Sequence, residues 1–454
     1  MKEQSLEGGV ETLAGGSFQL IIKGRAFVNE QLLDVTIHAT AEGFVERIEM
    51  GILAREGEVL DFVKPGYVIM PGFIDVHVHL RDWKQSYKED VRSGTYAAAA
   101  GGIVLVGDMP NTDPPVDTLA RIVERERTLA SKSVVDFVFY TKPCRNLEET
   151  LEGLKISSGV KVYPEDWHRF KSLASPKKGA RFKRELVIFH PEDPACLQLY
   201  SRHSGARGYG DDRPQECEVS AVEGILKSYA SLGFRVHLTH VSTRRSLEAV
   251  LTAKAGKNTT VTVDVTPHHL LLDKSAYEAL GSKAKVYPPL RGRDDREYLQ
   301  EAFAKGVIDL VASDHAPHAI EEKALDYERA PPGFSGVETL VPSIFTLAVA
   351  RGVPLSYFVR VLSRNPARLL GLDRYLGEIR PGALASFTVI DTKQWRRVRS
   401  DVLYSKSKFT PFEGWEFRGW PVATIVRSNL VFFDGEVYDS GFRGKNLRGL
   451  QAKS

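Results

Sequence analysis

Eight short apolar runs, each followed by a helix-like stretch, occupy the middle of this 454-residue chain and limit its fold more than any other feature. Apolar strands that alternate with helical segments predict parallel βαβ units, and eight such units can close into an α/β TIM (β/α)8 barrel. We therefore predict a barrel domain over residues 66–380. The predicted strands are Val68–His79, Ile103–Met109, Val135–Tyr140, Val160–Tyr163, Leu186–His190, Arg235–His240, Thr260–Thr266 and Val307–Asp314.

Strand-like runs on both sides of the predicted barrel indicate a second, smaller unit. Short runs with glycine-containing turns between them occupy residues 18–65, and similar runs return over 381–454. We expect these two segments to pair into one composite β-sandwich that the barrel interrupts. Residues 1–17 are polar and glycine-rich, and we expect them to form a mobile tail.

The overall charge and the cysteine content exclude several classes of protein. The 61 Lys and Arg residues nearly balance the 58 Asp and Glu residues, so no large field would attract nucleic acid or a membrane surface. The chain has no apolar run of about 18 residues and no signal-peptide-like N-terminus. Cys144, Cys196 and Cys217 are too few and too irregularly spaced for a disulfide framework. We therefore expect a cytoplasmic protein without nucleic-acid or membrane partners.

A strand with two different faces is predicted at residues 75–81, which read Asp-Val-His-Val-His-Leu-Arg. Because side chains alternate along a strand, His77, His79 and Arg81 share one face and apolar side chains take the other. An isolated His-x-His pair is a weak motif. Its meaning depends on whether further ligands occur at comparable positions.

Further ligand-type residues do occur at the ends of other predicted strands, and these ends converge on the catalytic face of a TIM barrel. With His77 and His79 they place four His, one Lys and one Asp around a single point. The additional residues are Lys161, His190, His240 and Asp314. Imidazole and carboxylate ligands suit zinc or a similar divalent metal, and a pair of metals would use this many ligands.

Lys161 is the unusual member of this set, because an ammonium group beside two cations would be repelled. Reaction of its neutral amine with CO2 would give a carbamate, and the two carbamate oxygens could bridge both metals. Asp314 alone could be a helix N-cap. It begins the stretch 314–318, however, which is denser in ionisable groups than a helix cap requires.

The remaining histidines have weaker claims to a site. His237 lies three positions before His240 and is predicted to face the other side of its strand. For His268 and His269, which follow another strand end, the sequence leaves open whether one of them lines the pocket. We interpret the others as surface or packing residues, namely His38, His168 and His203.

Several longer motifs give the chain a resemblance to the dihydroorotase family of cyclic amidohydrolases, from about residue 18 to 435. These motifs lie at residues 71–81, 108–112, 159–163, 237–242, 266–270, 313–318 and 377–382. The first and the sixth discriminate within the superfamily. Allantoinases and hydantoinases look similar at the metal ligands, but they lack the Arg of His-x-His-x-Arg and usually the last His of Asp-His-Ala-Pro-His.

The resemblance implies reversible hydrolysis of dihydroorotate to N-carbamoyl-L-aspartate, a step of de novo pyrimidine biosynthesis, at a site with two zinc ions. The implied ligands of one zinc are His77, His79 and Asp314. Those of the other are His190 and His240, with carbamylated Lys161 as the bridge. Asp314 would also act as the catalytic residue that carries a proton from water to the leaving ring nitrogen.

The resemblance also implies the residues that contact the substrate. Arg81, Asn111 and His318 would bind it, and the backbone at Pro332 and Gly333 would close over it. A planar guanidinium with an amide donor suits the ring carboxylate of dihydroorotate. Residues 316–336 have few apolar anchors, and we expect them to act as a lid.

The chain departs from the family pattern at three places. Tyr287 replaces the Asn of Asn-Pro-Pro-Leu-Arg, so an amide that contacts the substrate is missing. Asp-Trp-Lys at 82–84 replaces the usual Asp-Pro-Gly after Arg81. Some bacterial relatives use a bridging Asp a few residues beyond the position of Lys161, and Glu165 and Asp166 lie at that distance. We favour Lys161 as the bridge.

Two other functions stay open. The chain could be another cyclic amidohydrolase that acts on a hydantoin, allantoin or dihydropyrimidine. It could also be a metal-free homologue that binds another pyrimidine enzyme such as aspartate transcarbamoylase, but that function predicts lost ligands and all six candidates are present. A homodimer is a further expectation.

Overall fold

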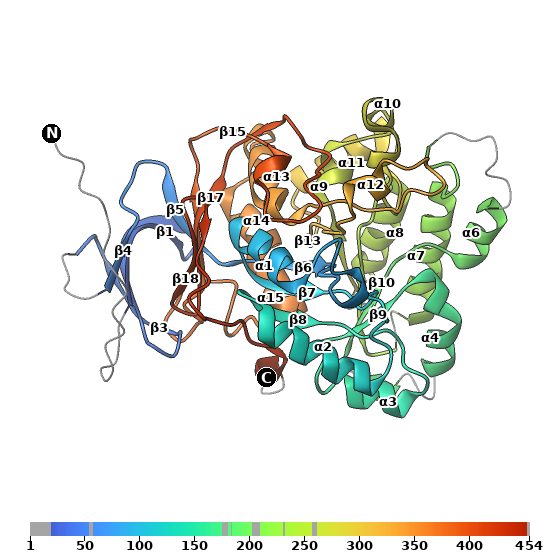
Figure 1. Cartoon of the computed structure of the whole chain (residues 1–454), viewed down its shortest axis with the longest axis horizontal. Coiled ribbons are helices and arrows are strands. Elements are labelled where there is room, and N and C mark those ends of the chain that lie inside the picture. The colour runs from blue at the N-terminus through green and yellow to red at the C-terminus, as the bar shows by residue number, and fades with distance from the viewer. Residues whose placement is uncertain are drawn as a thin grey trace.

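The computed structural model describes residues 20–53, 58–174, 180–182, 184–201, 209–229, 232–256 and 261–451. A helix-covered barrel adjoins a large β-sheet that combines the first and last strands of the chain (Figure 1). The expected mobile tail at 1–17 lies outside the described residues.

The barrel contains the expected eight parallel strands, in two hydrogen-bonded groups, β6-β7-β8 and β9 to β13. Isolated parallel bridges join the groups, Thr141 to Val160 at one seam and Val78 to His315 at the other. The strands are β6 (Phe73–Val78), β7 (Ile103–Asp108), β8 (Asp136–Phe139), β9 (Val160–Val162), β10 (Leu186–Phe189), β11 (Arg235–Leu238), β12 (Val261–Val265) and β13 (Leu310–Val311). The TIM-barrel prediction is confirmed.

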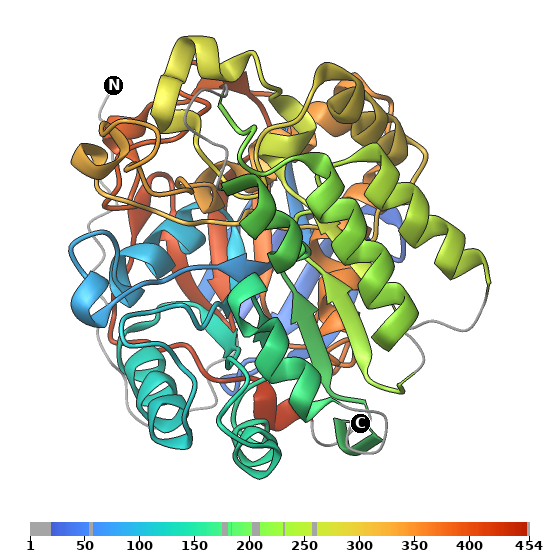
Figure 2. The same ribbon diagram turned by 90° about the vertical axis from the view of Figure 1, so that its right-hand side faces the viewer.

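Helices surround the strands, as Figure 2 shows along the barrel. Many begin at a side-chain cap, such as Asp90 before α1 and Thr243 before α8, which accept hydrogen bonds from the first turn. The helices are α1 (Val91–Ala100), α2 (Leu119–Lys132), α3 (Leu147–Gly153), α4 (Trp167–Leu173), α6 (Pro194–Ser201), α7 (Gln215–Tyr229), α8 (Arg244–Ala255), α9 (Pro267–Leu271), α10 (Ala276–Leu280), α11 (Arg293–Ala304), α12 (Ile320–Lys323), α13 (Val337–Ala350), α14 (Leu355–Val359), α15 (Asn365–Leu369) and α16 (Arg448–Gln451).

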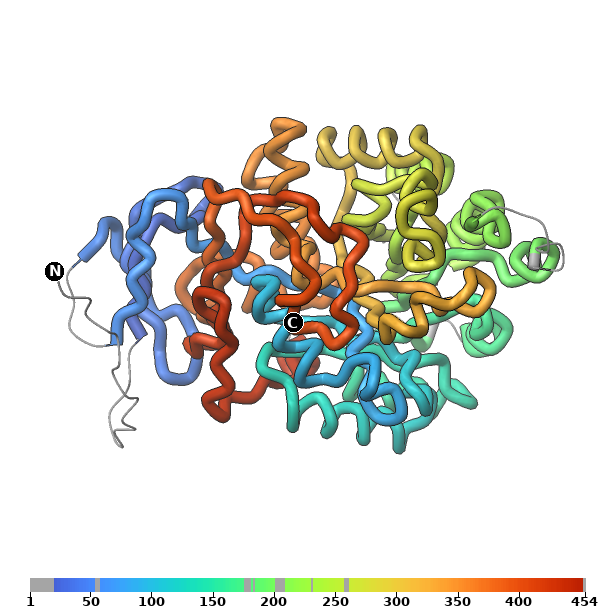
Figure 3. Tube along the Cα trace, turned by 45° about the horizontal axis from the view of Figure 1, so that its top comes forward, coloured from blue at the N-terminus to red at the C-terminus, as the bar shows by residue number. Residues whose placement is uncertain are grey.

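The second unit is a nine-stranded sheet with the order β19-β18-β17-β14-β5-β1-β2-β3, to which β4 adds beside β1. Its strands are β1 (Leu20–Val28), β2 (Gln31–Ala39), β3 (Val45–Met50), β4 (Glu58–Asp61), β5 (Tyr67–Pro71), β14 (Phe387–Asp391), β17 (Trp420–Val426), β18 (Asn429–Phe433) and β19 (Glu436–Val437). The C-terminal strands, red in Figure 3, lie beside the blue N-terminal ones. A separate apolar core fills this unit, so the composite β-sandwich is confirmed.

The strand expected at Val68–His79 is two strands, and Gly72 separates them. β5 pairs with β14 in the sandwich sheet, whereas β6 pairs with β7 in the barrel. A Cβ atom built on Gly72 would lie 2.5 Å from Cγ2 of Val104, so only glycine fits this crossing. The sheet therefore reaches Pro71, beyond the boundary at 65 that the sequence suggested.

Replacing Gly72 with alanine is expected to lower the free energy of unfolding by roughly 1–3 kcal/mol, because the new methyl group overpacks the buried Val104. Urea unfolding measures this change. Gly224→Ala is the matched control: nothing lies within 4 Å of its added Cβ, and it sits inside α7. The control is expected to be neutral or slightly stabilising, and equal destabilisation by both variants would contradict the packing argument.

The segment between β14 and β17 packs on the barrel rather than in the sheet. It contains a two-stranded ribbon, β15 (Arg396–Arg397) and β16 (Glu416–Phe417). Phe409 and Phe412 share an apolar core with Val286 and Phe334 of the barrel loops. This segment therefore supports the loops that surround the carboxyl ends of the strands.

The three cysteines build no disulfide framework, but two of them do pair. Cys196 in α6 and Cys217 in α7 form a disulfide, and Cys144 is free and buried. The two helices lie next to each other only in the folded chain, so a spacing of 21 residues did not reveal the pair. Within the described ranges, no helix has both the length and the apolar character needed to cross a membrane.

Candidate metal centre and substrate pocket

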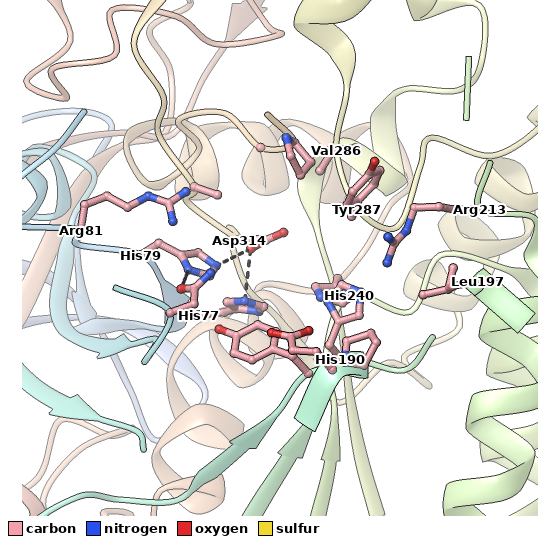
Figure 4. A pocket seen from close by; sticks show the side chains of 17 residues that line it. His77, His79, Arg81, His190, Leu197, Arg213, His240, Val286, Tyr287 and Asp314 are labelled. Carbon is pink, nitrogen blue, oxygen red and sulfur yellow. Dashed lines mark hydrogen bonds and ion pairs between the residues drawn. The ribbon is translucent and has the colours of Figure 1, made fainter. Parts of the chain in front are cut away.

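Three side chains converge at the carboxyl end of the barrel. Nε2 of His77 and Nε2 of His79, from the end of β6, lie 3.1 and 3.2 Å from the same oxygen of Asp314, which follows β13 (Figure 4). All three are buried, and their ligand atoms lie within 4.8 Å of one another. Asp75 accepts hydrogen bonds from the backbone N–H of His77 and of Ser313, both at 3.2 Å. It thereby joins the ends of β6 and β13.

Hydrogen bonding shows why these three groups fit a cation. Nδ1 of His79 lies 2.6 Å from the amide oxygen of Asn111, which can only accept, so Nδ1 carries the proton. Nε2 therefore presents a lone pair to the Asp314 carboxylate. Burial holds the pKa of His77 and His79 well below its usual range, so the rings are neutral. Neutral imidazoles that face a carboxylate are a donor set for a divalent metal.

His190 and His240 lie next to this group. The rings of His190 and His240 are 4.5 Å apart, and the rings of His77 and His240 are 5.3 Å apart. Nε2 of His190 donates to the buried carboxylate of Glu192 at 2.6 Å, which leaves Nδ1 of His190 as a lone-pair donor. Nδ1 of His240 is buried and has no hydrogen-bond partner in the described part of the chain. A second cation beside the first would use both nitrogens.

Lys161 is completely buried in β9. Its Nζ donates to Oγ1 of Thr239 at 2.8 Å, and among the described residues no carboxylate forms an ion pair with it. Burial lowers the pKa of Lys161 because the charged form loses hydration. The neutral amine that carbamate formation requires is therefore favoured.

The alternative bridging carboxylates have another partner. Glu165 and Asp166 each lie 3.0 Å from Nζ of Lys142, and the side chain of Glu165 is 65% exposed. Asp166 follows β9 in a short 3-10 turn and is directed to this lysine. The structure thus provides an ion-pair role for both carboxylates outside the ligand group.

A cavity of about 250 Å³ opens over the candidate ligands. Of the predicted substrate-binding residues, Arg81, Asn111, Pro332 and Gly333 line it. His318 is not in the lining and lies behind Arg81, with Nε2 of His318 3.2 Å from Nη2 of Arg81. The described wall residues are His77, His79, Arg81, Asn111, Tyr163, Pro164, Glu165, His190, Leu197, Arg213, His240, Val286, Tyr287, Asp314, Ala316, Pro332 and Gly333.

The proton on His318 can be placed from its neighbours. Nζ of Lys88, which can only donate, lies 3.1 Å from Nδ1 of His318, so Nδ1 accepts and Nε2 carries the hydrogen. Nε2 then donates to the carbonyl oxygen of Pro332 at 3.0 Å. Burial and the adjacent Arg81 and Lys88 lower the pKa of His318 far below its usual range. Neutral His318 therefore joins Lys88 to the loop at Pro332 and packs beside Arg81 without accepting a hydrogen bond from its guanidinium.

A buried ion pair places Arg81. Arg125 of α2 is fully buried; its Nε donates to Asp108 at 2.8 Å and its Nη1 donates to the carbonyl oxygen of Arg81 at 3.0 Å. The other oxygen of Asp108 accepts from the backbone N–H of Leu80. Arg81 has a φ of 47°, in the left-handed region that non-glycine residues rarely adopt. These contacts hold the strained backbone that directs the guanidinium into the cavity.

The altered loop after Arg81 has its own support. Asp82 accepts hydrogen bonds from the N–H of Trp83 and Val91, and it pairs with Nζ of Lys132 at 2.9 Å. Asp82 and Trp83 also have positive φ angles, 70° and 48°. The Asp-Trp-Lys sequence therefore builds a specific turn in place of the glycine-containing one.

The other histidines are mostly packing residues. His237 is not in the cavity wall, and its Nε2 lies 2.9 Å from Asp264. The expectation that it faces away from the barrel interior is wrong, because it lies level with Lys161 across β10 and shares a strand face with Thr239, which contacts Lys161. His268 and His269 are buried but lie outside the described cavity wall. His38 is buried and pairs with Glu49, and His168 is exposed. His203 lies outside the described residues.

Sequence reasoning named Tyr287 but missed Arg213, which packs on it in the cavity wall. The Arg213 guanidinium lies over the Tyr287 ring at 3.9 Å. Arg213 belongs to the chain between α6 and α7, and no motif marked it. The departure at Tyr287 was the available signal, because a changed pocket residue predicts a changed neighbour.

Comparison with known proteins agrees with this site. Residues 68–437 match the amidohydrolase family, and the chain belongs to that family. It is 38% identical to the dihydroorotase of Methanothermobacter thermautotrophicus over 83% of this chain and 87% of the relative. It is 34% identical to that of Bacillus cytotoxicus over 91% of this chain and 98% of the relative.

A similar solved structure is the L-hydantoinase (dihydropyrimidinase) from Arthrobacter aurescens. It has a TM-score of 0.85 and 26% identity, over 93% of this chain and 97% of that chain. The fold is therefore shared across cyclic amidohydrolases, whereas the higher sequence identities are to dihydroorotases.

Proposed function

We propose that this amidohydrolase interconverts dihydroorotate and N-carbamoyl-L-aspartate in de novo pyrimidine biosynthesis. The observation that carries the proposal is the buried guanidinium of Arg81 in the wall of a small cavity that also contains the candidate metal ligands. A buried cation needs an anionic partner. The ring carboxylate of dihydroorotate supplies one, whereas hydantoin and allantoin rings carry no carboxylate.

The ligand set suits two zinc ions. His77, His79 and Asp314 would hold one, His190 and His240 the other, and a carbamate on Lys161 would bridge them. To form that carbamate, the neutral amine adds to CO2, a C–N bond forms and one proton is released. When bound, the two ions supply Lewis acidity, which lowers the pKa of water and polarises a carbonyl group.

The chain's own residues bind, orient and move protons. Arg81 and Asn111 would hold the carboxylate, with His318 and the backbone at Pro332 and Gly333 completing that end of the pocket. Burial raises the pKa of the Asp314 carboxyl, which suits a group that takes a proton from attacking water and returns it to the leaving ring nitrogen. In the reverse direction Asp314 takes the proton from the ureido nitrogen as the ring closes.

The test is turnover of dihydroorotate and N-carbamoyl-L-aspartate by the zinc-loaded protein with bicarbonate present, with allantoin and hydantoin assayed in parallel. Selective turnover of dihydroorotate is the expected result. A preference for hydantoin would instead support the second candidate, a hydantoinase-type amidohydrolase, which the solved structure with a TM-score of 0.85 favours.

Two partner proposals extend this function. A homodimer in the cytoplasm, with association to aspartate transcarbamoylase, would suit an enzyme that uses the carbamoyl aspartate made by that partner. A metal-free scaffolding role is disfavoured, because that role predicts lost ligands, whereas all six candidates are present and three of them, His77, His79 and Asp314, lie together.

Lys161→Ala is expected to lower zinc content to below two ions per protein and to lower kcat by roughly 10³-fold or more, because the bridging ligand is lost. Metal analysis and dihydroorotate assays measure both. The exposed Lys155→Ala is the control. Partial recovery with propionate, a carboxylate small enough for the vacated space, would support the carbamate. A variant with two zinc ions and full activity would contradict it.

A further inference from the structure

Arg213 is a second guanidinium in the cavity wall, opposite Arg81. Figure 4 shows Arg81 and Arg213 on two sides of the pocket, with Asp314 and the histidines between them. Arg213 comes from the chain between α6 and α7, whereas Arg81 follows β6. The cavity therefore has three polar walls, and the proposed function uses only two of them.

Contacts on several sides hold Arg213 rigidly. Its Nε lies 3.1 Å from both carboxylate oxygens of Glu192, and its Nη2 donates to the same fully buried carboxylate. The flat face of the guanidinium lies on the ring of Tyr287, 3.9 Å from its centroid. Only 16% of the Arg213 side chain is exposed. These contacts leave Nη1 as the nitrogen available to the cavity.

The pairing with Glu192 decides what Arg213 can bind. Glu192 neutralises the guanidinium charge, so Arg213 differs from Arg81, which has no carboxylate ion pair among the described residues. A charge-neutralised guanidinium that still has a directed N–H favours a neutral acceptor such as a carbonyl oxygen. A second carboxylate would gain less there.

The shape of the substrate supplies such an acceptor at the required place. In dihydroorotate the carboxylate, the scissile carbonyl and the ureido carbonyl occupy alternate ring positions and point toward three corners of a triangle. If Arg81 holds the carboxylate and the scissile carbonyl faces Asp314 and the histidines, the ureido carbonyl is directed to the remaining wall. That wall carries Arg213 and Tyr287.

We propose that Arg213 donates a hydrogen bond from Nη1 to the ureido carbonyl oxygen and so determines specificity for a ureido group. The proposal rests on the proposed function. It also explains Tyr287. The family pattern has an Asn amide at this position that contacts the substrate; in this chain Tyr287 supports Arg213, and Arg213 takes over the contact. In the cyclising direction the bond limits rotation of the ureido group and aims its terminal nitrogen at the carboxyl carbon.

The experiment changes the acceptor and the donor separately. kcat/KM is measured for dihydroorotate and for 2-thiodihydroorotate, in which a weakly accepting sulfur replaces the ureido oxygen. Alkaline hydrolysis of both compounds gives their intrinsic reactivity ratio. The wild-type preference for oxygen should exceed this ratio by about 10-fold or more, the effect of one hydrogen bond from the ion-paired guanidinium. Arg213→Met should remove most of the excess, and Arg213→Lys should retain part of it.

Arg244→Met is the matched control, since Arg244 also lies over a tyrosine, Tyr298, and pairs with a glutamate, Glu248, but lies outside the cavity wall. It should keep the full oxygen preference. Zinc content is measured for each variant, because Glu192 also contacts His190. If an Arg213 variant loses zinc or fails to fold, the test is whether the oxygen preference of the wild-type protein exceeds the alkaline ratio.

The outcomes separate this inference from the proposed function. Turnover of dihydroorotate without an oxygen preference above the alkaline ratio would overturn the role of Arg213 alone. So would an unchanged preference in a zinc-replete Arg213→Met protein. Absence of dihydroorotate turnover in the zinc-loaded wild type would overturn both proposals.

Discussion

Asp314→Asn is expected to lower kcat/KM for dihydroorotate by roughly 10³-fold or more, because one group would lose both of its functions. The same oxygen of Asp314 faces Nε2 of His77 and of His79. An amide is a poorer metal ligand than a carboxylate, and it cannot carry a proton from water to the ring nitrogen. The variant changes the shape of the side chain very little, so the loss reports on charge and proton transfer.

Steady-state kinetics in both directions, together with zinc content, measure this effect. Asp309→Asn is the control, because Asp309 precedes β13 at the opposite end of the barrel and pairs with Lys254. A control that keeps normal activity would show that the loss is specific to the site. Retention of more than a tenth of wild-type activity by Asp314→Asn would contradict its proposed role.

Arg81→Met is expected to lower kcat/KM for dihydroorotate by about 10²- to 10³-fold. Removing one partner of a buried charge pair costs roughly 3–5 kcal/mol, and here the substrate carboxylate would lose its cation. Methionine keeps most of the apolar volume of the side chain, and the fold should persist because Arg125 bonds to the backbone of residue 81 rather than to its side chain. Most of the loss should appear as an increase in KM.

Kinetics with added guanidinium ion provide a second measurement for this variant. Partial recovery is expected, because the small cation can occupy the space left beside His318. Arg121→Met in α2 is the control, since the side chain of Arg121 forms an exposed pair with Glu124 and lies outside the described cavity wall. An unchanged KM in Arg81→Met would mean that the carboxylate binds elsewhere, and Arg213 would then be the alternative anchor.

Much of the fold could be predicted from local patterns. Each barrel strand is a short apolar run, and a run of this kind is stable only when helices cover it, so the alternation predicts the architecture. The candidate metal ligands were also predictable, because His77, Lys161, His190 and His240 occur at or near strand ends, and parallel strands bring these ends together.

Other features depended on contacts between distant segments. Gly72 divides one apolar run into two strands because Val104 leaves no space for a Cβ atom there. The Cys196–Cys217 disulfide exists because α6 and α7 pack side by side. Neither packing contact has a signature in the neighbouring residues.

In the pocket, too, some features follow from local sequence patterns and others from contacts between distant segments. The sequence by itself determined a TIM barrel with a composite β-sandwich, a cluster of metal-ligand residues and an arginine on the ligand face, because the periods of strands and helices are local properties. Only the tertiary structure decided that His318 lies behind Arg81, outside the cavity wall, and that Arg213 forms the opposite wall. Those placements depend on ion pairs and ring contacts between loops far apart in the chain, and such contacts form only once the barrel has brought the loops together.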